Sequence, residues 1–309
     1  MAIVGQSKLD AASITFETLY QENFGPGQMP RTAGLISKEI PVQSKTLKTT
    51  HAGGYPKVRK WRGDKLFKDL RAFDQEITVE PYEASIEMNA LDVDGDRTGN
   101  TQRVLSDFLA SEANAVEQIV WDAILTNPIG YDGVSILNDT HPYSNSTGDN
   151  KFTDGFSITL YNTMREQMMA IQDEQGRSRN VTPNTLFVGS ALETEALEAT
   201  GADQVIYFDN TGAEATSGVV GAVTRPNPNK GTANVVVVPP FTGTQYLLAD
   251  LTKPVRPFVT LIFEAFNPQT QLKKDDEARF LRNKYRYSLE GIYGIGAGAW
   301  WLVAGKLTA

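Results

Sequence analysis

The stretch YPKVRKWRGDKLFKDLR, residues 55–71, carries seven basic residues against two acidic ones, although the whole chain has a formal net charge of −8. The next stretch, DQEITVEPYEASIEMNALDVDGD at residues 74–96, contains eight acidic residues and no basic one. A charge of +5 over 17 residues therefore gives way to −8 over 23 residues. This division of charge raises the question of what the basic half binds.

Two patterns in this region predict strands. Apolar residues alternate with polar ones at Ile77 and Val79 and again at Ile86 and Met88, which favours strands with one apolar and one charged face. Pro81 lies between the two pairs and cannot donate a ladder hydrogen bond, so it favours an edge strand or a bulge. Residues 53–89 are therefore predicted to form an extended β-rich loop.

The basic half of this loop has three interpretations. A solvated strand face is the default for a run of charges, and basic residues interleaved with Trp61 and Phe67 are typical of a single-stranded nucleic-acid site. The acidic half favours docking between copies of the chain, because electrostatic complementarity sets register and specificity between partners. The residues predicted to carry this contact are Lys57, Arg59, Lys60, Trp61, Arg62, Lys65, Lys68, Arg71, Asp74, Glu76, Glu80, Glu83 and Glu87.

The bulk composition is that of a globular protein. The chain has 309 residues, 40% hydrophobic and 21% charged, so it can form one large domain or a few smaller ones. A pI near 5.0 argues against a general DNA-coating protein. Without cysteine there is no disulfide or thiolate site. The N-terminus lacks the apolar core of a secretory signal, and the longest apolar run, at 300–304, is too short for a bilayer, so a soluble protein is expected.

Hydrophobic periodicity predicts an α+β chain. A helix is expected near residues 9–24, and the polar stretch 31–50 is expected to order only on a partner. Residues 98–127 carry an apolar stripe, broken only by Glu112, which predicts one rod of about 40 Å. Further along, the pattern predicts a helix at 158–174, a buried strand and helix within 184–201, a buried strand at 234–241, and strands to the C-terminus.

The sequence predicts no catalytic, cofactor-binding or metal-binding residues. Its two histidines, His51 and His141, lie in segments rich in Gly, Pro, Asn and Ser, which are typical of loops. Asp139 is two residues from His141, but metal sites usually need three or four ligands and no other histidine or cysteine is near. A structural or surface role is therefore expected for His141.

Two motifs resemble ligand loops but lack the rest of the pattern. DVDGD at residues 92–96 begins like a calcium loop, yet arginines occupy the places of the required Gly and Glu. GIGAGAW at residues 294–300 resembles a nucleotide-binding turn, yet the sequence after it predicts a strand where the motif needs a helix. Close packing between strands is the better explanation of these glycines.

The order of these parts resembles the major head subunit of Mu-like tailed phages, a capsid protein with the Hong Kong 97 fold. The resemblance covers about residues 53–307, and none of its motifs is an active-site signature. The segments that carry it are GGYPKVRKWRGDKLFKDL (53–70), NDTHPYSN (138–145), PNTLFVGSALETEAL (183–197) and YRYSLEGIYGIGAGAWWLVAGKL (285–307).

The resemblance implies an α+β Hong Kong 97-type fold and a non-enzymatic role as the major capsid protein of a tailed double-stranded DNA phage or prophage. The implied parts are an N-terminal arm (1–50), an extended loop (51–90), a peripheral domain with a spine helix (91–155), an axial domain (156–254) and return strands (255–309). The implied partners are further copies in pentamers and hexamers, a portal, a scaffold, a decoration protein and non-specifically contacted DNA, with no membrane. The expected place is the virion capsid, assembled in the host cytoplasm.

Two alternatives remain at this point. An encapsulin-like compartment shell would have the same fold, and a neighbouring gene for a terminase or portal would favour the phage instead. A hydrolase belongs to another class, and His141, Asp139 and nearby carboxylates would be its candidate residues. No nucleophile or ligand set accompanies them, so the hydrolase is the weaker alternative.

Overall fold

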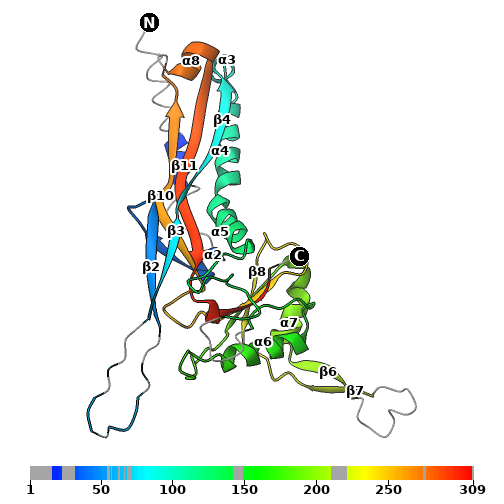
Figure 1. The fold of residues 1–309 in the computed structure, drawn as a ribbon. Helices are drawn as coiled ribbons and strands as arrows, with labels where there is room; N and C mark the ends of the chain where they lie inside the picture. Colours follow the sequence, from blue (N-terminus) through cyan, green and yellow to red (C-terminus); the bar gives the residue numbers. More distant parts are fainter. Residues whose placement is uncertain are drawn as a thin grey trace. The chain divides into compact units, whose positions relative to one another are not determined.

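The computed structural model describes residues 16–22, 32–53, 56, 58–61, 63–65, 67, 71–141, 149–209, 221–273 and 276–307. The chain divides into two compact units, each made of three segments (Figure 1). The first unit comprises residues 1–48, 76–122 and 259–295, and the second comprises residues 49–75, 123–258 and 296–309.

A four-stranded sheet forms the centre of the first unit. The strand order is β1 (Ser37–Pro41), β10 (Phe258–Gln271), β11 (Lys284–Ala297) and β4 (Glu80–Asn89). β11 and β4 pair antiparallel over their length, from Lys284 opposite Asn89 to Tyr293 opposite Glu80. Pro81 lies in β4, which is an edge strand of this sheet, as its missing N–H predicts.

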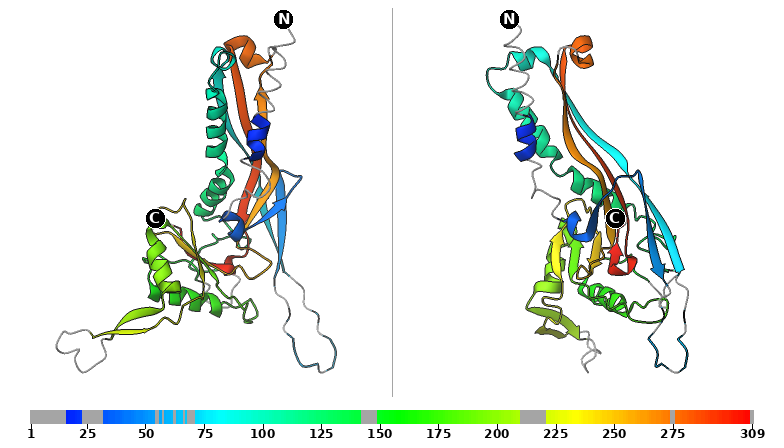
Figure 2. Two further views of the ribbon diagram at one scale, coloured as in Figure 1. Left: turned by 180° about the vertical axis from the view of Figure 1, so that it is seen from behind. Right: turned by 90° about the vertical axis from the view of Figure 1, so that its left-hand side faces the viewer.

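Helices cover one face of this sheet (Figure 2). They are α4 (Asn100–Glu112), α5 (Ala115–Leu125) and the helical residues 16–22, and their apolar side chains pack on alternate residues of β11. Phe16 contacts Tyr287 with ring centroids 5.1 Å apart. The prediction of one continuous helix over 98–127 is wrong, because two non-helical residues separate α4 from α5 directly after Glu112, the polar residue in the stripe.

The opposite face is covered only in part. The first unit includes residues 46–48 of β2 (Thr46–Gly53) and residues 76–78 of β3 (Arg71–Thr78), two strands that pair with each other, and these residues contribute to the cover. Ile77 of β3, with Val79 just beyond the strand, packs against Leu261 of β10. Along the other part of this face, the outward side chains of β4 and β11 are polar and accessible.

The polar stretch 31–50 packs within its own chain where the structure describes it, so the expectation that it orders only on a partner is wrong. It contains α2 (Ala33–Ile36), β1 and most of β2. Ile36 is fully buried, and the Trp121 indole N–H donates to the Thr32 hydroxyl over 2.9 Å. A few buried side chains and one shared strand edge are enough to hold a mostly polar segment.

Short helices close one end of the first unit's sheet. α3 (Ala90–Asp94) follows β4, and α8 (Glu277–Arg282) precedes β11. Arg279 of α8 lies 3.2 Å from the Asp94 carboxylate, and the Tyr285 hydroxyl donates to the same carboxylate over 3.0 Å.

The second unit is built on a mixed sheet in the order β12 (Val303–Lys306), β9 (Tyr246–Ala249), β5 (Thr185–Val188) and β8 (Asn234–Val237). Its core also includes α6 (Ile158–Ala170) and α7 (Glu193–Gly201), which follows the 3₁₀ turn η1 (Ser190–Leu192). The predicted strand-to-helix unit within 184–201 is confirmed. The strand predicted to be buried at 234–241 is instead the short, partly exposed edge strand β8.

Two further elements complete this unit. β6 (Gln204–Asp209) and β7 (Gly221–Pro226) form an antiparallel hairpin of their own. The 3₁₀ turn η3 (Trp300–Leu302) joins β11 to β12. Among the helices that the structure describes, none combines the length and hydropathy needed to cross a bilayer.

Candidate subunit interface

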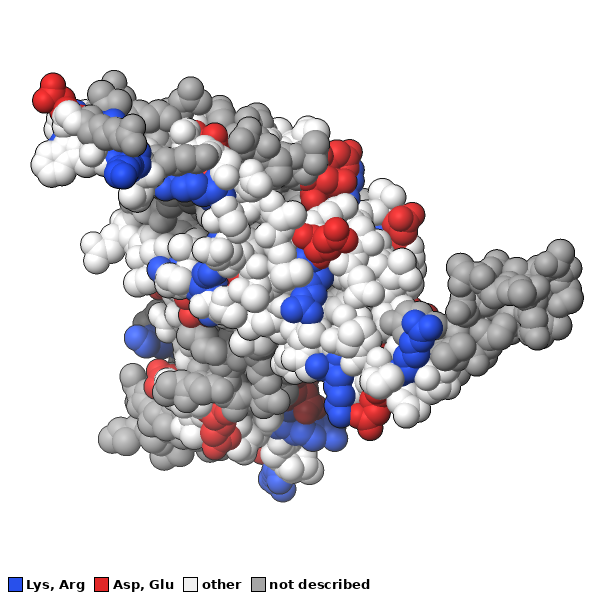
Figure 3. Space-filling view, turned by 90° about the horizontal axis from the view of Figure 1, so that it is seen from below, with Lys and Arg blue, Asp and Glu red and all other residues white. Residues whose placement is uncertain are grey.

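Charged side chains of both signs are interspersed on the face shown in Figure 3. Lys and Arg alternate with Asp and Glu among uncharged residues, and the described part of this face carries no broad basic surface. A protein that grips DNA along its length presents many phosphate-neutralising residues together.

The described residues of the β2–β3 loop expose apolar and basic groups together. Val58, Trp61 and Phe67 are 100%, 73% and 93% exposed. The Lys65 ammonium lies 5.9 Å from the centre of the Trp61 ring, and the indole N–H donates to the Gly63 carbonyl. Large apolar groups on a solvated loop are typical of a contact surface.

Part of the predicted basic set lies outside the described residues, namely Lys57, Arg62 and Lys68. For Arg71 the structure gives only its place as the first residue of β3. Arg59, Lys60 and Lys65 are described and exposed. Arg59 donates to the Asp64 carbonyl over 2.9 Å, which helps to shape the turn around Gly63, whose φ is +79°.

Among the predicted acidic residues, Glu87 is paired within its own chain. Its carboxylate accepts hydrogen bonds from the Lys284 ammonium at 2.5 Å and from Arg286 at 2.7 Å, both on the adjacent strand β11. These two cations hold the pKa of Glu87 at about 2. The Glu87 carboxylate is therefore already paired with β11 in the isolated subunit.

The other acidic residues of this run are divided between elements. In β3, Glu76 lies 3.8 Å from Lys48 of β2, and Asp74 lies on the same exposed strand face. Glu80 begins β4 on the strand face that also carries Tyr82. Burial raises the pKa of Tyr82, and the nearby Glu80 adds to that rise. The structure thus disperses a run of acids that is continuous in sequence.

Glu83 has a different environment, because it faces a second carboxylate. The register places Glu83 of β4 directly opposite Glu290 of β11, and both side chains are exposed. Like charges directly opposite on a strand pair are destabilising. Hydroxyls moderate the repulsion, since Ser85 donates to Glu83 over 2.6 Å and Ser288 approaches Glu290 at 3.5 Å. Within the described part of the chain, neither carboxylate has an ion-pair partner.

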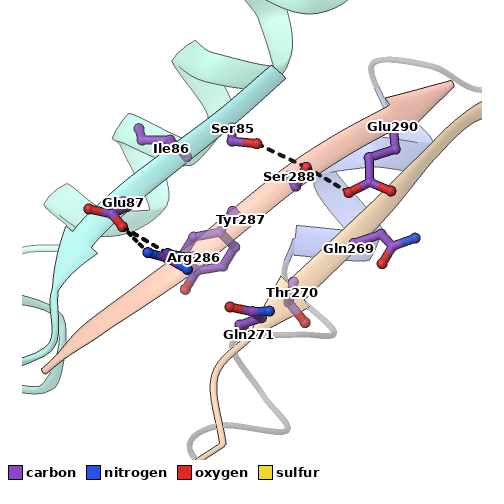
Figure 4. A pocket seen from close by; sticks show the side chains of 10 residues that line it. All are labelled: Ser85, Ile86, Glu87, Gln269, Thr270, Gln271, Arg286, Tyr287, Ser288 and Glu290. Carbon is purple, nitrogen blue, oxygen red and sulfur yellow. Dashed lines mark hydrogen bonds and ion pairs between the residues drawn. The ribbon is translucent and has the colours of Figure 1, made fainter. Parts of the chain in front are cut away.

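A shallow polar groove of about 330 Å³ runs beside this pair (Figure 4). Side chains from three adjacent strands line it: Ser85, Ile86 and Glu87 of β4, Gln269, Thr270 and Gln271 of β10, and Arg286, Tyr287, Ser288 and Glu290 of β11. Amides, hydroxyls and charges along a strand face can bind the backbone and side chains of an extended peptide. We call this surface, together with Glu83, the open face.

Sequence reasoning missed the β11 half of the open face. Arg286 and Glu290 were not among the predicted contact residues, although KYRYSLE at 284–290 alternates polar and apolar residues in the way expected of a half-exposed strand. That alternation could have identified the two charges as one surface. Their position opposite β4 could not have been found, because strand pairing across about 200 residues leaves no local signal.

The sequence predicted a structural or surface role for His141, and in the structure its side chain is buried. Its partner is Asp132, with His141 Nδ1 2.6 Å from Asp132 Oδ2. The neighbour in sequence, Asp139, does not fill this role. In the described ranges no group of three or more His, Asp or Glu side chains is arranged to hold a metal ion.

Solved structures with the same fold are phage capsid proteins. The procapsid protein of bacteriophage JBD30 matches with a TM-score of 0.53 and 17% identity, covering 97% of this chain and 74% of its own. The mature capsid of bacteriophage PhiM1 gives 0.56 and 12%, and the capsid of cyanophage P-SCSP1u gives 0.57 and 10%, each covering 89% of this chain and 86% of its own. The chain therefore has the Hong Kong 97-type capsid fold expected from its sequence.

The sequence itself defines the family within that fold. The profile of the Mu-like prophage major head subunit gpT family matches residues 9–158 and 207–308. The chain belongs to this family. A search of curated proteins found no relative.

Family and fold together give the function. The chain is a major capsid protein of a tailed phage or prophage, a structural protein of the icosahedral head, and its place is the virion capsid. Capsid shells are built from many copies of such a subunit, so the functional site is a set of contacts between copies.

Proposed function

We propose that the loop of one subunit, residues 56–71, docks on the open face of a neighbouring subunit and so links the copies of the shell. The observation that carries this proposal is the opposed pair Glu83 and Glu290. Two carboxylates across a strand pair repel each other in the isolated chain, and a cation from another chain would turn that repulsion into attraction.

The two surfaces carry charges of opposite sign. The segment 55–71 has a formal charge of +5, and Arg59, Lys60 and Lys65 are exposed near its turn. Because Glu76 and Glu87 lie beside cations of their own chain, Glu83 and Glu290 form the acidic centre that this loop is expected to reach. The proposed acceptor keeps Glu83 from the acidic residues predicted from sequence, leaves out the paired Glu76 and Glu87, and adds Glu290.

Apolar contact supplies the affinity that surface charges lack. Exposed ion pairs contribute about 0–1 kcal/mol each, so two carboxylates alone do not hold a shell together. Trp61 and Phe67 are large, exposed and close to the basic residues. Aromatic anchors surrounded by charge are typical of the strongest positions in protein interfaces.

A charge exchange between the two surfaces tests the docking. Glu83→Lys with Glu290→Lys is expected to abolish assembly of the purified protein while leaving the subunit folded, and so is Arg59→Glu with Lys60→Glu. Combining all four substitutions restores opposite charges and is expected to recover assembled particles, seen by electron microscopy and sedimentation.

The matched control is Glu195→Lys, which reverses an exposed glutamate on α7 of the second unit. It is expected to leave assembly close to wild type. Normal particles from either double variant would refute the docking. So would failure of the four-fold variant, provided that circular dichroism shows it to be folded.

The nucleic-acid interpretation of the loop gives a different outcome in the same experiment. If the basic residues serve packaged DNA, Arg59→Glu with Lys60→Glu leaves empty particles intact and lowers their DNA content. The reversal of Glu83 and Glu290 would then have no counterpart to rescue. We place the DNA contact second, because the loop has a complementary surface on the same protein.

The remaining parts of the proposal follow the family plan. Residues 91–155 and 255–309 would belong to the peripheral domain, 156–254 to the axial domain around the shell's five- and six-fold axes, 51–90 to the extended loop and 1–50 to the arm. A portal, a scaffold and a decoration protein would be further partners. Packaged double-stranded DNA would be contacted only non-specifically, in keeping with the net charge of −8.

A further inference from the structure

A buried polar cluster in the second unit has no part in the contacts proposed above. It consists of Asp132, His141 and Asn150, with Trp300 stacked on the histidine. The side chains of His141 and Asp132 are 0% and 1% exposed. Polar groups this deeply buried must satisfy one another, so the hydrogen-bond pattern determines where the protons lie.

The orientation of Asn150 is determined by its donors. Its amide nitrogen lies 2.8, 3.2 and 3.0 Å from the carbonyl oxygens of Ile136, Trp300 and Val303. The amide oxygen therefore faces the other way, where it accepts from the Asn138 N–H at 2.9 Å and lies 3.2 Å from His141 Nε2. Because that oxygen can only accept, His141 Nε2 carries a hydrogen.

The second ring nitrogen also faces an acceptor. His141 Nδ1 lies 2.6 Å from Asp132 Oδ2, the separation of a short charge-assisted hydrogen bond. The imidazole ring stacks on Trp300, with centroids 3.8 Å apart and planes 2° from parallel. An indole face attracts a cation, so the stacking favours placing the charge on the ring.

We propose that Asp132 and His141 form a buried carboxylate–imidazolium pair, and that this pair is a clasp between the linker after α5 and the C-terminal segment of η3 and β12. Without the Nδ1 proton, the lone pairs of Nδ1 and of Asp132 Oδ2 would face each other at 2.6 Å in a buried site. The Asn150 oxygen would then accept from a neutral Nε2–H in place of a charged one, while its amide still binds Trp300 and Val303. The contact between the two segments is therefore stronger with the charged ring.

Charged groups of both signs surround the pair. Burial raises the pKa of Asp149, Asp139 adds to that rise, and Lys151 and His141 oppose it, so Asp149 lies within electrostatic range of the ring. On the other side of the cluster, the Trp300 N–H donates to the Tyr131 hydroxyl over 3.2 Å. The titratable and charged groups around the clasp are Asp132, Asp139, Asp149, Lys151, Tyr131 and Arg179.

Nitrogen NMR of assembled particles labelled with ¹⁵N-histidine tests the charge directly. The chain has only two histidines, so His51→Asn leaves the signals of His141 alone. At pH 7.5 both ring nitrogens of His141 are expected to carry hydrogen. A ring with one unprotonated nitrogen at that pH would overturn the proposal, whether the proton sits on Asp132 or is absent.

Thermal stability provides the second test. The melting temperature of the unassembled chain at pH 7.5 is expected to fall in His141→Gln and in Asp132→Asn, because each substitution leaves the other member of the pair buried without its charged partner. Asp139→Asn is the matched control and should keep the wild-type melting temperature. Wild-type melting temperatures in both clasp variants would contradict the proposal. If the variants do not fold, the nitrogen spectrum of the otherwise native chain decides alone.

Discussion

The Glu87 side chain is exposed, and its carboxylate is nevertheless paired within its own chain. It belongs to an acidic run that looks available in sequence, but Lys284 and Arg286 bind it from the neighbouring strand. The pairing is local in space and remote in sequence, so no inspection of residues 74–96 could have found it. The choice among the acidic residues of the open face depends on such pairings.

The pKa of Glu87 leads to a prediction in acid. A carboxyl whose folded pKa is lowered to about 2 stabilises the fold above the ordinary glutamate range, and this contribution is lost as pH falls toward 2. Glu87→Gln is expected to reduce the loss of stability between pH 5 and pH 2.5, measured by urea unfolding of the unassembled chain.

Salt and a neutral control separate this effect from general acid unfolding. Glu87, Lys284 and Arg286 form a triad whose side chains are about one-third exposed. Added salt should therefore weaken the difference in acid stability between wild type and Glu87→Gln. Glu195→Gln changes an exposed residue of α7, and its unfolding free energy should depend on pH as that of the wild type does. Identical acid profiles for wild type and Glu87→Gln would show that the triad contributes nothing measurable.

Gly294 gives a second prediction at this scale. A Cβ on Gly294 of β11 would lie 2.6 Å from the Thr78 carbonyl oxygen and 3.0 Å from Val79, so backbone would have to move. Gly294→Ala is expected to destabilise the chain by about 1–3 kcal/mol, the usual cost of overpacking. Gly155→Ala, where a Cβ would meet nothing within 4 Å, should change the urea midpoint little.

At the scale of elements, the sequence indicated β3 and β4 but not β2. Alternating apolar residues marked β3 and β4, and Ile77 and Val79 do pack inward against Leu261. Most of β2 lies in the polar stretch 31–50, which shows no such alternation. The charge division marked the loop between β2 and β3. Periodicity was less informative where burial is two-sided or partial, as in β8, since a run of valines does not show how many of its faces are covered.

The loop also provides a prediction that does not involve charge. Trp61→Ala removes the largest exposed side chain near the turn and should not alter the melting temperature of the isolated subunit. The protein concentration needed for assembly is expected to rise about ten-fold, which corresponds to about 1.4 kcal/mol per contact. Light scattering across a dilution series measures this concentration.

Trp61→Phe is the conservative counterpart, because it keeps an aromatic ring for contact and for Lys65. Its assembly should fall between those of wild type and Trp61→Ala. Wild-type assembly of the alanine variant would mean that the loop contributes no apolar anchor. A lowered melting temperature would place Trp61 in the folding of the subunit instead.

At the scale of the whole molecule, the class of protein was visible in the sequence while the pairing of its strands was not. The order of a charge-divided loop, a long helix, an α/β middle and a Gly-rich terminal strand was enough to recognise a capsid subunit. It could not show that β11 lies between β10 and β4, or that residues 37–41 complete the same sheet. Such partners are chosen by packing across the whole chain, and each strand alone fits several arrangements.

Hydrogen exchange can compare the free chain with the particle. In the unassembled chain, amides of β1 and β10 should be protected, because these strands pair within one subunit. Amides of 58–67 should exchange quickly there and gain at least ten-fold protection in the particle if the loop docks. Equal exchange of 58–67 in both states would contradict docking, whereas unprotected β1 in the free chain would contradict the fold described for residues 37–41.

The central position of β11 has a consequence for the timing of synthesis. β4 and β11 are 195 residues apart, counting from Asn89 to Lys284, and the ribosome needs roughly 10–40 s to make that length at about 5–20 residues per second. Throughout this interval the emerging β4 lacks the strand that completes its sheet. The open face, which needs both strands, does not exist until β11 has been made. Under the docking proposed above, nascent chains that lack β11 offer one another no open face, and a chain can accept the loop of a neighbour only after β11 has paired with β4.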